Sequence, residues 1–374
     1  MGSIREMRLY EVWMPLREEF ETSFGSTRLR PAIIVRLIGP GGEEGLGEVV
    51  AGEGPWYSYE TVGTAWEALT RYIPRFIPGE PDPWAFQEAA SRIRGHNMAK
   101  AGVDEALWDL RARLESKPLY EAIGSKWRPV RVGVSIGIKR SVDELLAAVR
   151  GYLEAGYGRI KIKVKPGWDV DIVRAVRREY PDVPLQVDAN AAYTLRDLPV
   201  LEELDRRGLL MIEQPLHYDD LLDHAHLARR LRTPICLDES VKSPLHARWA
   251  LQLDSASIIN VKPGRVGGVT PSLEIHRLWS LEAGRPIWIG GMLETGIGRA
   301  VLVSLATLPG VKYPSDISAS DRYYEEDIIT EPWTLQPGST LHPRRGPGLG
   351  VDVDWDRLEK YTRRTATVRL ARHS

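Results

Sequence analysis

The sequence predicts an α/β protein in two parts, an N-terminal capping domain followed by a (β/α) barrel. Two observations carry this prediction. The first half-hundred residues alternate short apolar strands with glycine-rich turns and lead into a helical region. From about residue 126 onward, short apolar strands alternate instead with amphipathic segments. With 374 residues, the chain is long enough to bury more than one small core.

The capping domain is expected over residues 1–125 as an α+β unit. Its predicted strands are Arg8–Met14, Arg30–Leu37 and Gly45–Val50, which would form a small antiparallel meander. From Ser58 to Leu119 the apolar residues recur at helical spacing, with breaks at prolines. We therefore expect helices packed on a small sheet.

The barrel is expected over residues 126–323, where eight apolar segments recur at roughly even intervals. Eight parallel strands is the number at which a sheet closes into a barrel, with helices covering its outer face. The predicted strands are Val130–Ile138, Arg159–Val164, Leu185–Asn190, Met211–Pro215, Ile235–Ser240, Ser257–Pro263, Ile287–Gly291 and Lys312–Ile317. Residues 324–374 contain several prolines and glycines and are expected to return to the capping domain as an irregular strap.

Composition argues against several classes of function. The chain has 50 Lys+Arg and 51 Asp+Glu, a net charge of −1, so no overall field draws it to nucleic acid or to anionic membranes. Cys236 is the only cysteine, which rules out an intramolecular disulfide and fits a reducing compartment. The first residues contain no long apolar run, so we expect neither a signal peptide nor a membrane span. These features predict a soluble cytoplasmic protein that acts on a small molecule.

Charged and polar residues stand near the ends of five consecutive predicted strands, where the active sites of such barrels lie. In chain order they are Lys161 and Lys163, Asp188 and Asn190, Glu213, Asp238 and Glu239, and Lys262. One charged residue at a strand end is usually a solvated side chain. A full set on successive strands indicates a functional site.

Asp188, Glu213 and Asp238 come from three consecutive strands and should converge as a cluster of carboxylates. Like charges held together repel, so we expect this cluster to require a bound cation. The donors are hard oxygen atoms, and none of the eight histidines ends a predicted strand. The donor set therefore predicts Mg²⁺, with Mn²⁺ as a substitute, rather than zinc or copper.

Lys161 and Lys163 should point into the barrel together, because side chains alternate along a strand. Lys163 and Lys262 stand on opposite sides of the three carboxylate strands, so a substrate carbon is expected between them. A neighbouring lysine and a metal should lower the lysine pKa, which would allow the amine to act as a base. A carboxylate substrate fits this arrangement, because a metal stabilises the negative charge that forms when the α proton leaves.

The motifs Lys161-Ile162-Lys163, Asp188-Ala189-Asn190, Glu213-Gln214-Pro215, Asp238-Glu239-Ser240 and Lys262-Pro263-Gly264 resemble those of the muconate lactonizing enzyme subgroup of the enolase superfamily. The resemblance covers nearly the whole chain. Longer blocks are similar to o-succinylbenzoate synthases that also racemise N-succinylamino acids: residues 159–167 (RIKIKVKPG), 186–193 (QVDANAAY), 235–240 (ICLDES), 260–268 (NVKPGRVGG), 290–299 (GGMLETGIGR) and 318–322 (SASDR). The fold implied is a (β/α)7β-type TIM barrel with an N-terminal α+β capping domain.

The resemblance implies a role for each residue of the set. Lys163 would remove the α proton, and Lys262 would stabilise the enolate in a dehydration or reprotonate it from the opposite face in a racemisation. Lys161 would support Lys163, while Asp188, Glu213 and Asp238 would bind Mg²⁺. The residues expected near the substrate are Asn190, Ser135, Gly291, Met292, Arg265 beside Lys262, and Phe20 in a covering loop near residues 16–25. Relatives commonly form even-numbered rings, which implies a homo-oligomer.

The activity implied is that of a lyase, o-succinylbenzoate synthase. It dehydrates 2-succinyl-6-hydroxy-2,4-cyclohexadiene-1-carboxylate in menaquinone biosynthesis, and the same site could racemise N-succinylamino acids. A dedicated N-acylamino acid racemase or dipeptide epimerase is the alternative, because dehydration and racemisation begin with the same proton transfer. A non-catalytic barrel is the third reading, but it predicts loss of the charged set, and all three carboxylates and all three lysines are present.

Overall fold

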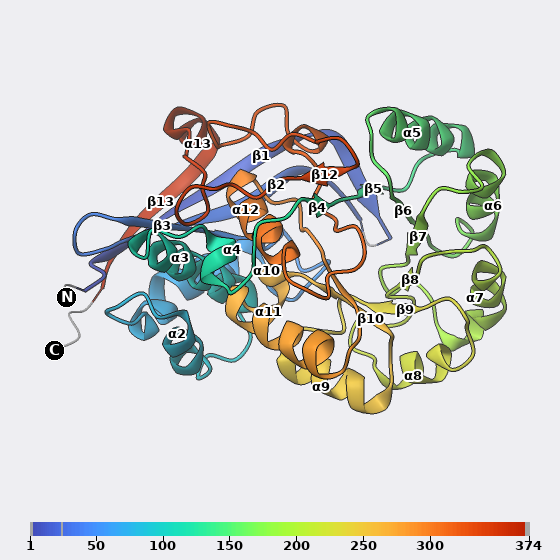
Figure 1. The fold of residues 1–374 in the computed structure, drawn as a ribbon, viewed down its shortest axis with the longest axis horizontal. Helices are drawn as coiled ribbons and strands as arrows, with labels where there is room; N and C mark the ends of the chain where they lie inside the picture. Colours follow the sequence, from blue (N-terminus) through green and yellow to red (C-terminus); the bar gives the residue numbers. More distant parts are fainter. Residues whose placement is uncertain (1–2, 24, 371–374) are drawn as a thin grey trace.

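The computed structural model describes residues 3–23 and 25–370, which form a strand-rich capping part and a curled parallel sheet surrounded by helices (Figure 1). The α/β fold class expected from the sequence is confirmed. The sheet of the capping part and the parallel sheet lie side by side, with the C-terminal segment running back along the first strands.

The sheet of the capping part has four antiparallel strands within the described residues, in the order β13-β1-β2-β3. They are β1 (Glu6–Thr22), β2 (Gly25–Ile38), β3 (Glu44–Val49) and β13 (Thr362–Arg369). Val35 packs in one core cluster with Leu107 of helix α3 (Asn97–Leu114), whereas Ile34 belongs to a different cluster, which includes the barrel. Because both faces of this sheet are covered, the apolar run of β2 is continuous rather than alternating.

The helices of the capping part are α1 (Val62–Glu67), α2 (Pro83–Ala90), α3 (Asn97–Leu114) and α4 (Leu119–Ala122). Asp82 fixes the start of α2, because its side chain accepts hydrogen bonds from the amides of Trp84 and Ala85. Pro83 occupies the first helical position, where its missing amide hydrogen is not needed.

The parallel sheet contains seven strands in the described part of the chain, in the order β11-β10-β9-β8-β7-β6-β5. They are β5 (Val134–Ile136), β6 (Ile160–Lys163), β7 (Leu185–Asp188), β8 (Ile212–Glu213), β9 (Ile235–Leu237), β10 (Ile258–Val261) and β11 (Ile287–Ile289). A short antiparallel pair, β4 (Val130–Arg131) with β12 (Thr340–Leu341), adjoins it. All seven strands fall within the predicted ones.

The eighth predicted strand, Lys312–Ile317, is not a regular strand. It contributes single bridges instead, from Ser315 to Val132 on one side and from Asp316 to Gly290 on the other. Pro314 lies in the middle of this segment and has no amide hydrogen to donate, which limits regular pairing. The bridges nevertheless join the two edges of the sheet, so the ring is closed.

The helices outside the sheet are α5 (Val142–Glu154), α6 (Val170–Glu179), α7 (Leu198–Asp205), α8 (Leu222–Ala228), α9 (Pro244–Leu253), α10 (Pro263–Val266), α11 (Val269–His276), α12 (Gly296–Ala306) and α13 (Trp355–Tyr361). The C-terminal segment predicted as an irregular strap thus contains α13 and β13, and β13 pairs with β1. Among the helices that the structure describes, none combines the length and apolar character needed to cross a lipid bilayer.

The predicted covering loop is the outer part of the β1–β2 hairpin, which we call the hairpin arm (residues 16–23 and 25–29). It reaches over the open end of the barrel. Its backbone contacts several barrel loops: the Arg17 amide donates to the Tyr323 carbonyl at 2.9 Å, and the Ile138 amide donates to the Glu21 carbonyl at 3.0 Å. Most of the residues that we expected as a loop are therefore strand, in which residues 20–22 pair with β2 and a break in the register leaves residues 16–19 unpaired with β2.

Candidate active site

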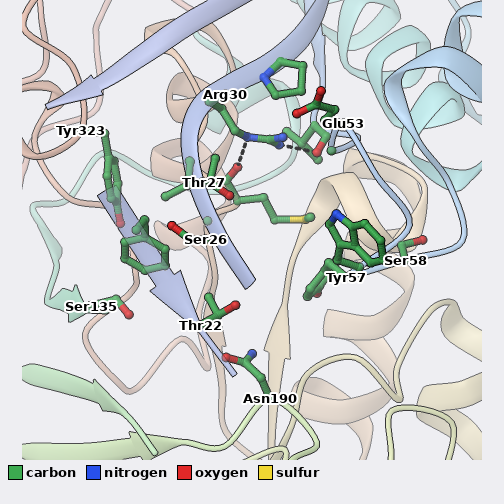
Figure 2. Close-up of a pocket in the computed structure, with 18 of the residues that line it drawn as sticks. Thr22, Ser26, Thr27, Arg30, Glu53, Tyr57, Ser58, Ser135, Asn190 and Tyr323 are labelled. Atoms are coloured by element: carbon green, nitrogen blue, oxygen red, sulfur yellow. Dashed lines mark hydrogen bonds between the residues drawn. The ribbon is translucent and has the colours of Figure 1, made fainter. Parts of the chain in front are cut away.

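A cavity of about 430 Å³ lies between the capping part and the open end of the barrel. Figure 2 shows Ser135 and Asn190 at the barrel end of this cavity, with Tyr323 and Tyr57 on opposite sides. The polar side chains at its base come from the ends of the parallel strands, as the sequence predicted. The hairpin arm and residues 50–60 of the capping part form much of the remaining wall.

Asp188, Glu213 and Asp238 converge at the base of the site. Asp188 and Glu213 are paired residues at the ends of β7 and β8, and Asp238 directly follows β9. One ligand oxygen from each lies within 4.8 Å of the others, and all three side chains are buried. Three converging carboxylate oxygens in a buried pocket suit a hard divalent cation.

Neighbouring amides hold these carboxylates in place. Asn260 of β10 donates from Nδ2 to Glu213 Oε1 at 2.6 Å, and the Asp238 amide donates to Gln214 Oε1 at 2.9 Å. A side chain at Gly290 would overlap the Asn260 amide. Glycine at this position therefore makes room for a residue that orients a carboxylate.

Lys163 and Lys262 flank the carboxylates on opposite sides. Lys163 ends β6, and its Nζ lies 2.6 Å from Asp188 Oδ2. Lys262 follows β10, and its Nζ lies 2.7 Å from Asp238 Oδ2. Because β7, β8 and β9 lie between β6 and β10 in the sheet, the two amines approach the cluster from its two ends.

Basic groups already balance part of the negative charge of the cluster. Both flanking lysines contact it, Lys161 Nζ lies 2.9 Å from Glu213 Oε2, and Arg265 pairs with Asp238. Repulsion among the carboxylates therefore does not by itself require a metal, contrary to the argument from the sequence. The convergence of the three ligand oxygens is the observation that supports a cation site.

Asp316 is a further buried carboxylate at the site, and the sequence prediction overlooked it. Its two oxygens lie 2.5 Å from Lys161 Nζ and 2.6 Å from Arg159 Nη2. Burial alone would lower the pKa of Lys161, but the carboxylates of Asp316, Glu213 and Asp188 outweigh it and raise that pKa. With no metal bound, these carboxylates therefore hold Lys161 as an ammonium ion. Asp316 is the second-last residue of the eighth predicted strand, so a search for polar residues at strand ends would have found it.

Tyr57 is a second residue that the sequence gave no reason to select. It comes from the capping part, and its hydroxyl donates to Asp238 Oδ1 at 3.2 Å and accepts from Lys262 Nζ at 3.5 Å. Its ring centroid lies 4.9 Å from the same ammonium group, which adds a cation–π contact. The capping part thus contributes directly to the surroundings of Lys262.

Arg265 lies behind the carboxylates rather than in the 430 Å³ cavity. Its guanidinium pairs with Asp238, donates to the Val241 carbonyl at 2.8 Å and donates to the Asn260 carbonyl at 2.6 Å. It lines a second cavity of about 470 Å³ on the other side of Tyr57. The other residues expected near the substrate line the first cavity: Phe20, Ser135, Lys161, Asn190, Gly291 and Met292.

Two of these residues have geometry that bears on binding. Ser135 Oγ is buried and has no hydrogen-bond partner among the described residues, so it is free to bond a ligand in the cavity. Phe20 of the hairpin arm packs edge-on against Tyr323, with ring centroids 6.2 Å apart. This aromatic pair closes the cavity on the arm side.

Comparison with known proteins places the chain among enzymes. The family model described as "Enolase C-terminal domain-like" matches residues 144–357, and that of the "Mandelate racemase / muconate lactonizing enzyme, N-terminal domain" matches residues 4–124. An o-succinylbenzoate synthase of Geobacillus kaustophilus is 47% identical over 98% of this chain and 99% of its own length. An N-succinylamino acid racemase of Thermus thermophilus is 46% identical over 96% of each chain. The solved structure of an enolase superfamily member from Listeria innocua covers 99% of this chain and is itself covered completely, with a TM-score of 0.93 at 38% identity.

Proposed function

Because the chain belongs to the enolase superfamily, within its mandelate racemase and muconate lactonizing enzyme group, we propose that it removes a proton next to a substrate carboxylate in a Mg²⁺-dependent reaction. The reaction proposed is that of an o-succinylbenzoate synthase, the dehydration of 2-succinyl-6-hydroxy-2,4-cyclohexadiene-1-carboxylate. Racemisation of N-succinylamino acids in the same site is part of the proposal. Among relatives at 44–47% identity, some are named o-succinylbenzoate synthase and others N-succinylamino acid racemase.

One observation carries the proposal, the placement of Lys163 and Lys262 at the two ends of the carboxylate cluster. A planar enediolate has two faces, and an amine on each face can take or return a proton. Asp188, Glu213 and Asp238 would hold the Mg²⁺. When bound, this ion would supply positive charge beside the substrate carboxylate, which favours loss of the α proton. Mn²⁺ has similar ligand preferences and is expected to substitute.

The side chains of the protein supply the remaining steps. Lys163, in its neutral form, would accept the α proton at Nζ, with Asp188 and Asn190 holding that nitrogen in place at 2.6 and 2.8 Å. In dehydration, the protonated Lys262 would stabilise the developing negative charge from the other face, and the proton held by Lys163 would pass to the departing hydroxyl, which leaves as water. In racemisation, the same Lys262 would deliver a proton to that face.

The walls of the cavity fit a ligand with a polar and an apolar end. Ser135, Lys161 and Asn190 line the barrel end of the cavity, and Phe20, Met292 and Tyr323 line its sides. A succinyl-bearing carboxylate combines a charged group with a larger carbon skeleton, so it can use both surfaces. The single cysteine, Cys236, is buried beneath the site and supports placing the protein in a reducing compartment such as the cytoplasm.

Two reactions followed in parallel test the proposal. Purified protein with Mg²⁺ is given the dehydration substrate, and separately one enantiomer of an N-succinylamino acid in D₂O. Product formation from the first and deuterium uptake with inversion of the second are expected. Turnover of the first alone would restrict the function to a synthase, and exchange of the second alone would make it a racemase. No reaction with either would refute the proposed function.

A further inference from the structure

We propose that Glu239 is a positioning residue that fixes the side-chain amide of Asn190 and, through it, the ammonium or amine nitrogen of Lys163. The inference rests on the proposed role of Lys163 as the base. Glu239 follows Asp238 at the end of β9, outside the set of metal ligands and lysines that the sequence assigned. It does not line the 430 Å³ cavity. Its effect on the reaction would therefore be indirect.

Three side chains form a continuous hydrogen-bonded chain. Lys163 Nζ donates to Asn190 Oδ1 at 2.8 Å, and Asn190 Nδ2 donates to Glu239 Oε1 at 3.0 Å. Lys163, Asn190 and Glu239 are 7%, 8% and 4% exposed, so little water is available to replace a lost partner. The chain thus links the proposed base to a carboxylate on a different strand.

The chemistry of the two ends dictates which way the amide points. An ammonium group can only donate and a carboxylate can only accept, so the oxygen of Asn190 must face Lys163 and its nitrogen must face Glu239. The reversed amide would place two donors against each other at Lys163 and two acceptors at Glu239. Glu239 therefore selects the orientation that presents an acceptor to the lysine.

The backbone of Asn190 is already held, which leaves the side-chain amide as its adjustable part. Asn190 has a φ of +43°, a conformation that few residues other than glycine adopt. Its amide donates to Asp188 Oδ1 at 3.0 Å, and its carbonyl accepts from Ser23 Oγ of the hairpin arm at 3.2 Å. With the main chain fixed in this way, rotation of the side chain decides where Oδ1 lies.

The surroundings of Glu239 leave it little other structural purpose. Among the described residues, Glu239 Oε1 accepts a hydrogen bond from the side-chain amide of Asn190, and Glu239 Oε2 is buried without a hydrogen-bond partner. No ion pair to Glu239 is formed within that part of the chain. Burying a carboxylate costs free energy. The hydrogen bond that Glu239 makes in exchange orients the side-chain amide of Asn190.

Lys262 provides an internal control, because its contacts are with Asp238 and Tyr57 and not with Asn190. The charge of Glu239 nevertheless reaches Lys262 through space. The matched pair of variants is therefore E239Q, which removes the charge but keeps an acceptor for Asn190, and E239L, which removes both. Any difference between them reports the hydrogen bond rather than the charge.

The experiment measures exchange of the α proton in D₂O, with Mg²⁺, from each enantiomer of an N-succinylamino acid. The K163A variant identifies the enantiomer that faces Lys163, and K262A identifies the other. In E239L, exchange from the Lys163-facing enantiomer should fall roughly tenfold to hundredfold, the cost of a misplaced catalytic group. For the other enantiomer, the exchange rate in E239L should equal the exchange rate in E239Q. The ratio of the two rates in one sample does not depend on how much protein is folded.

A double-mutant cycle with Asn190 provides the second test. If Glu239 acts through Asn190, E239L should add nothing to the loss caused by N190A, so E239L/N190A and N190A should exchange at the same rate. Equal loss from both enantiomers in E239L would overturn the proposal, as would losses that multiply in the double variant. An E239Q variant as slow as E239L would overturn it too.

Failure of the proposed function would look different. If neither K163A nor K262A selectively abolished exchange from one enantiomer, the two-lysine mechanism would be wrong, whatever E239L did. The positioning role is then decided by a crystal structure of E239L. A Lys163 Nζ to Asn190 Oδ1 distance unchanged from 2.8 Å would overturn it, and a displaced or reversed amide would support it.

Discussion

Replacing Asp316 with asparagine should destabilise the protein, because this buried carboxylate pairs with two buried cations. Its oxygens lie 2.5 Å from Lys161 Nζ and 2.6 Å from Arg159 Nη2, and the Arg159 side chain is fully buried. Burial opposes its ionisation, but Arg159 and Lys161 together lower the pKa of Asp316 from 3.8 to about 2. A lower pKa in the folded state means that the ionised carboxylate stabilises the fold.

The magnitude follows from that shift. A change from 3.8 to about 2 corresponds to about 2 kcal/mol of the free energy of unfolding at pH 7. This stabilisation is present above pH 3.8 and is lost as the pH falls through about 2. An independent figure comes from buried ion pairs in general, where removing one partner typically costs about 3 to 5 kcal/mol in total. The two figures bracket the expectation that D316N lowers the free energy of unfolding by about 2 to 5 kcal/mol.

Urea unfolding at pH 7, followed by tryptophan fluorescence, would measure this loss. D321N is the matched control, because Asp321 is exposed and its side chain should contribute less than about 0.5 kcal/mol. The turnover number of D316N should also fall, since Lys161 loses one of its anchors. A loss of stability below about 1 kcal/mol would refute the view that Asp316 is a main partner of the two cations.

Three further predictions concern pH, metal and the hairpin arm. Burial raises the pKa of Glu60 from 4.5 to about 7, so this residue lowers stability as the pH rises across that interval. E60Q should therefore gain about 3 kcal/mol in free energy of unfolding relative to the wild type between pH 4.5 and 8. Urea titrations at several pH values would measure this, and a difference between the two proteins that does not change with pH would contradict it. Dialysis against EDTA should abolish turnover, and Mg²⁺ or Mn²⁺ should restore it; activity that survives chelation would exclude a metal role. F20A should raise KM about tenfold with a smaller change in kcat, because it removes an aromatic wall of the cavity worth about 1 to 2 kcal/mol. Steady-state kinetics with E19A as control would test it, and an unchanged KM would show that the arm does not contact the substrate.

The sequence predicted the barrel well because its signals are local. Alternation of strand and helix patterns located every regular parallel strand of the described residues. The expectation that polar residues at strand ends converge correctly placed Lys163, Asp188 and Lys262 together. The eighth segment was expected to be a full strand, but Pro314 interrupts its pairing. Asp316 was missed on that same segment although the same expectation applied to it.

Contacts between the two parts of the chain were harder to predict. Tyr57 reaches Asp238 across 181 positions, and its own neighbourhood carries no catalytic motif. The hairpin arm was expected to be a loop from the family resemblance, but most of it is strand, and residues 20–22 pair with β2. Charge balance also depends on the fold: the repulsion predicted among three carboxylates is offset by lysines and an arginine that the structure brings beside them.

A crystal structure with Mg²⁺ and o-succinylbenzoate would test the central claim most directly. We predict one metal ion bound by Asp188, Glu213 and Asp238 at about 2.0 to 2.1 Å, with the ligand carboxylate beside it. Lys163 and Lys262 should then lie on opposite faces of the carbon next to that carboxylate. A metal bound elsewhere, or both lysines on the same face, would contradict the account.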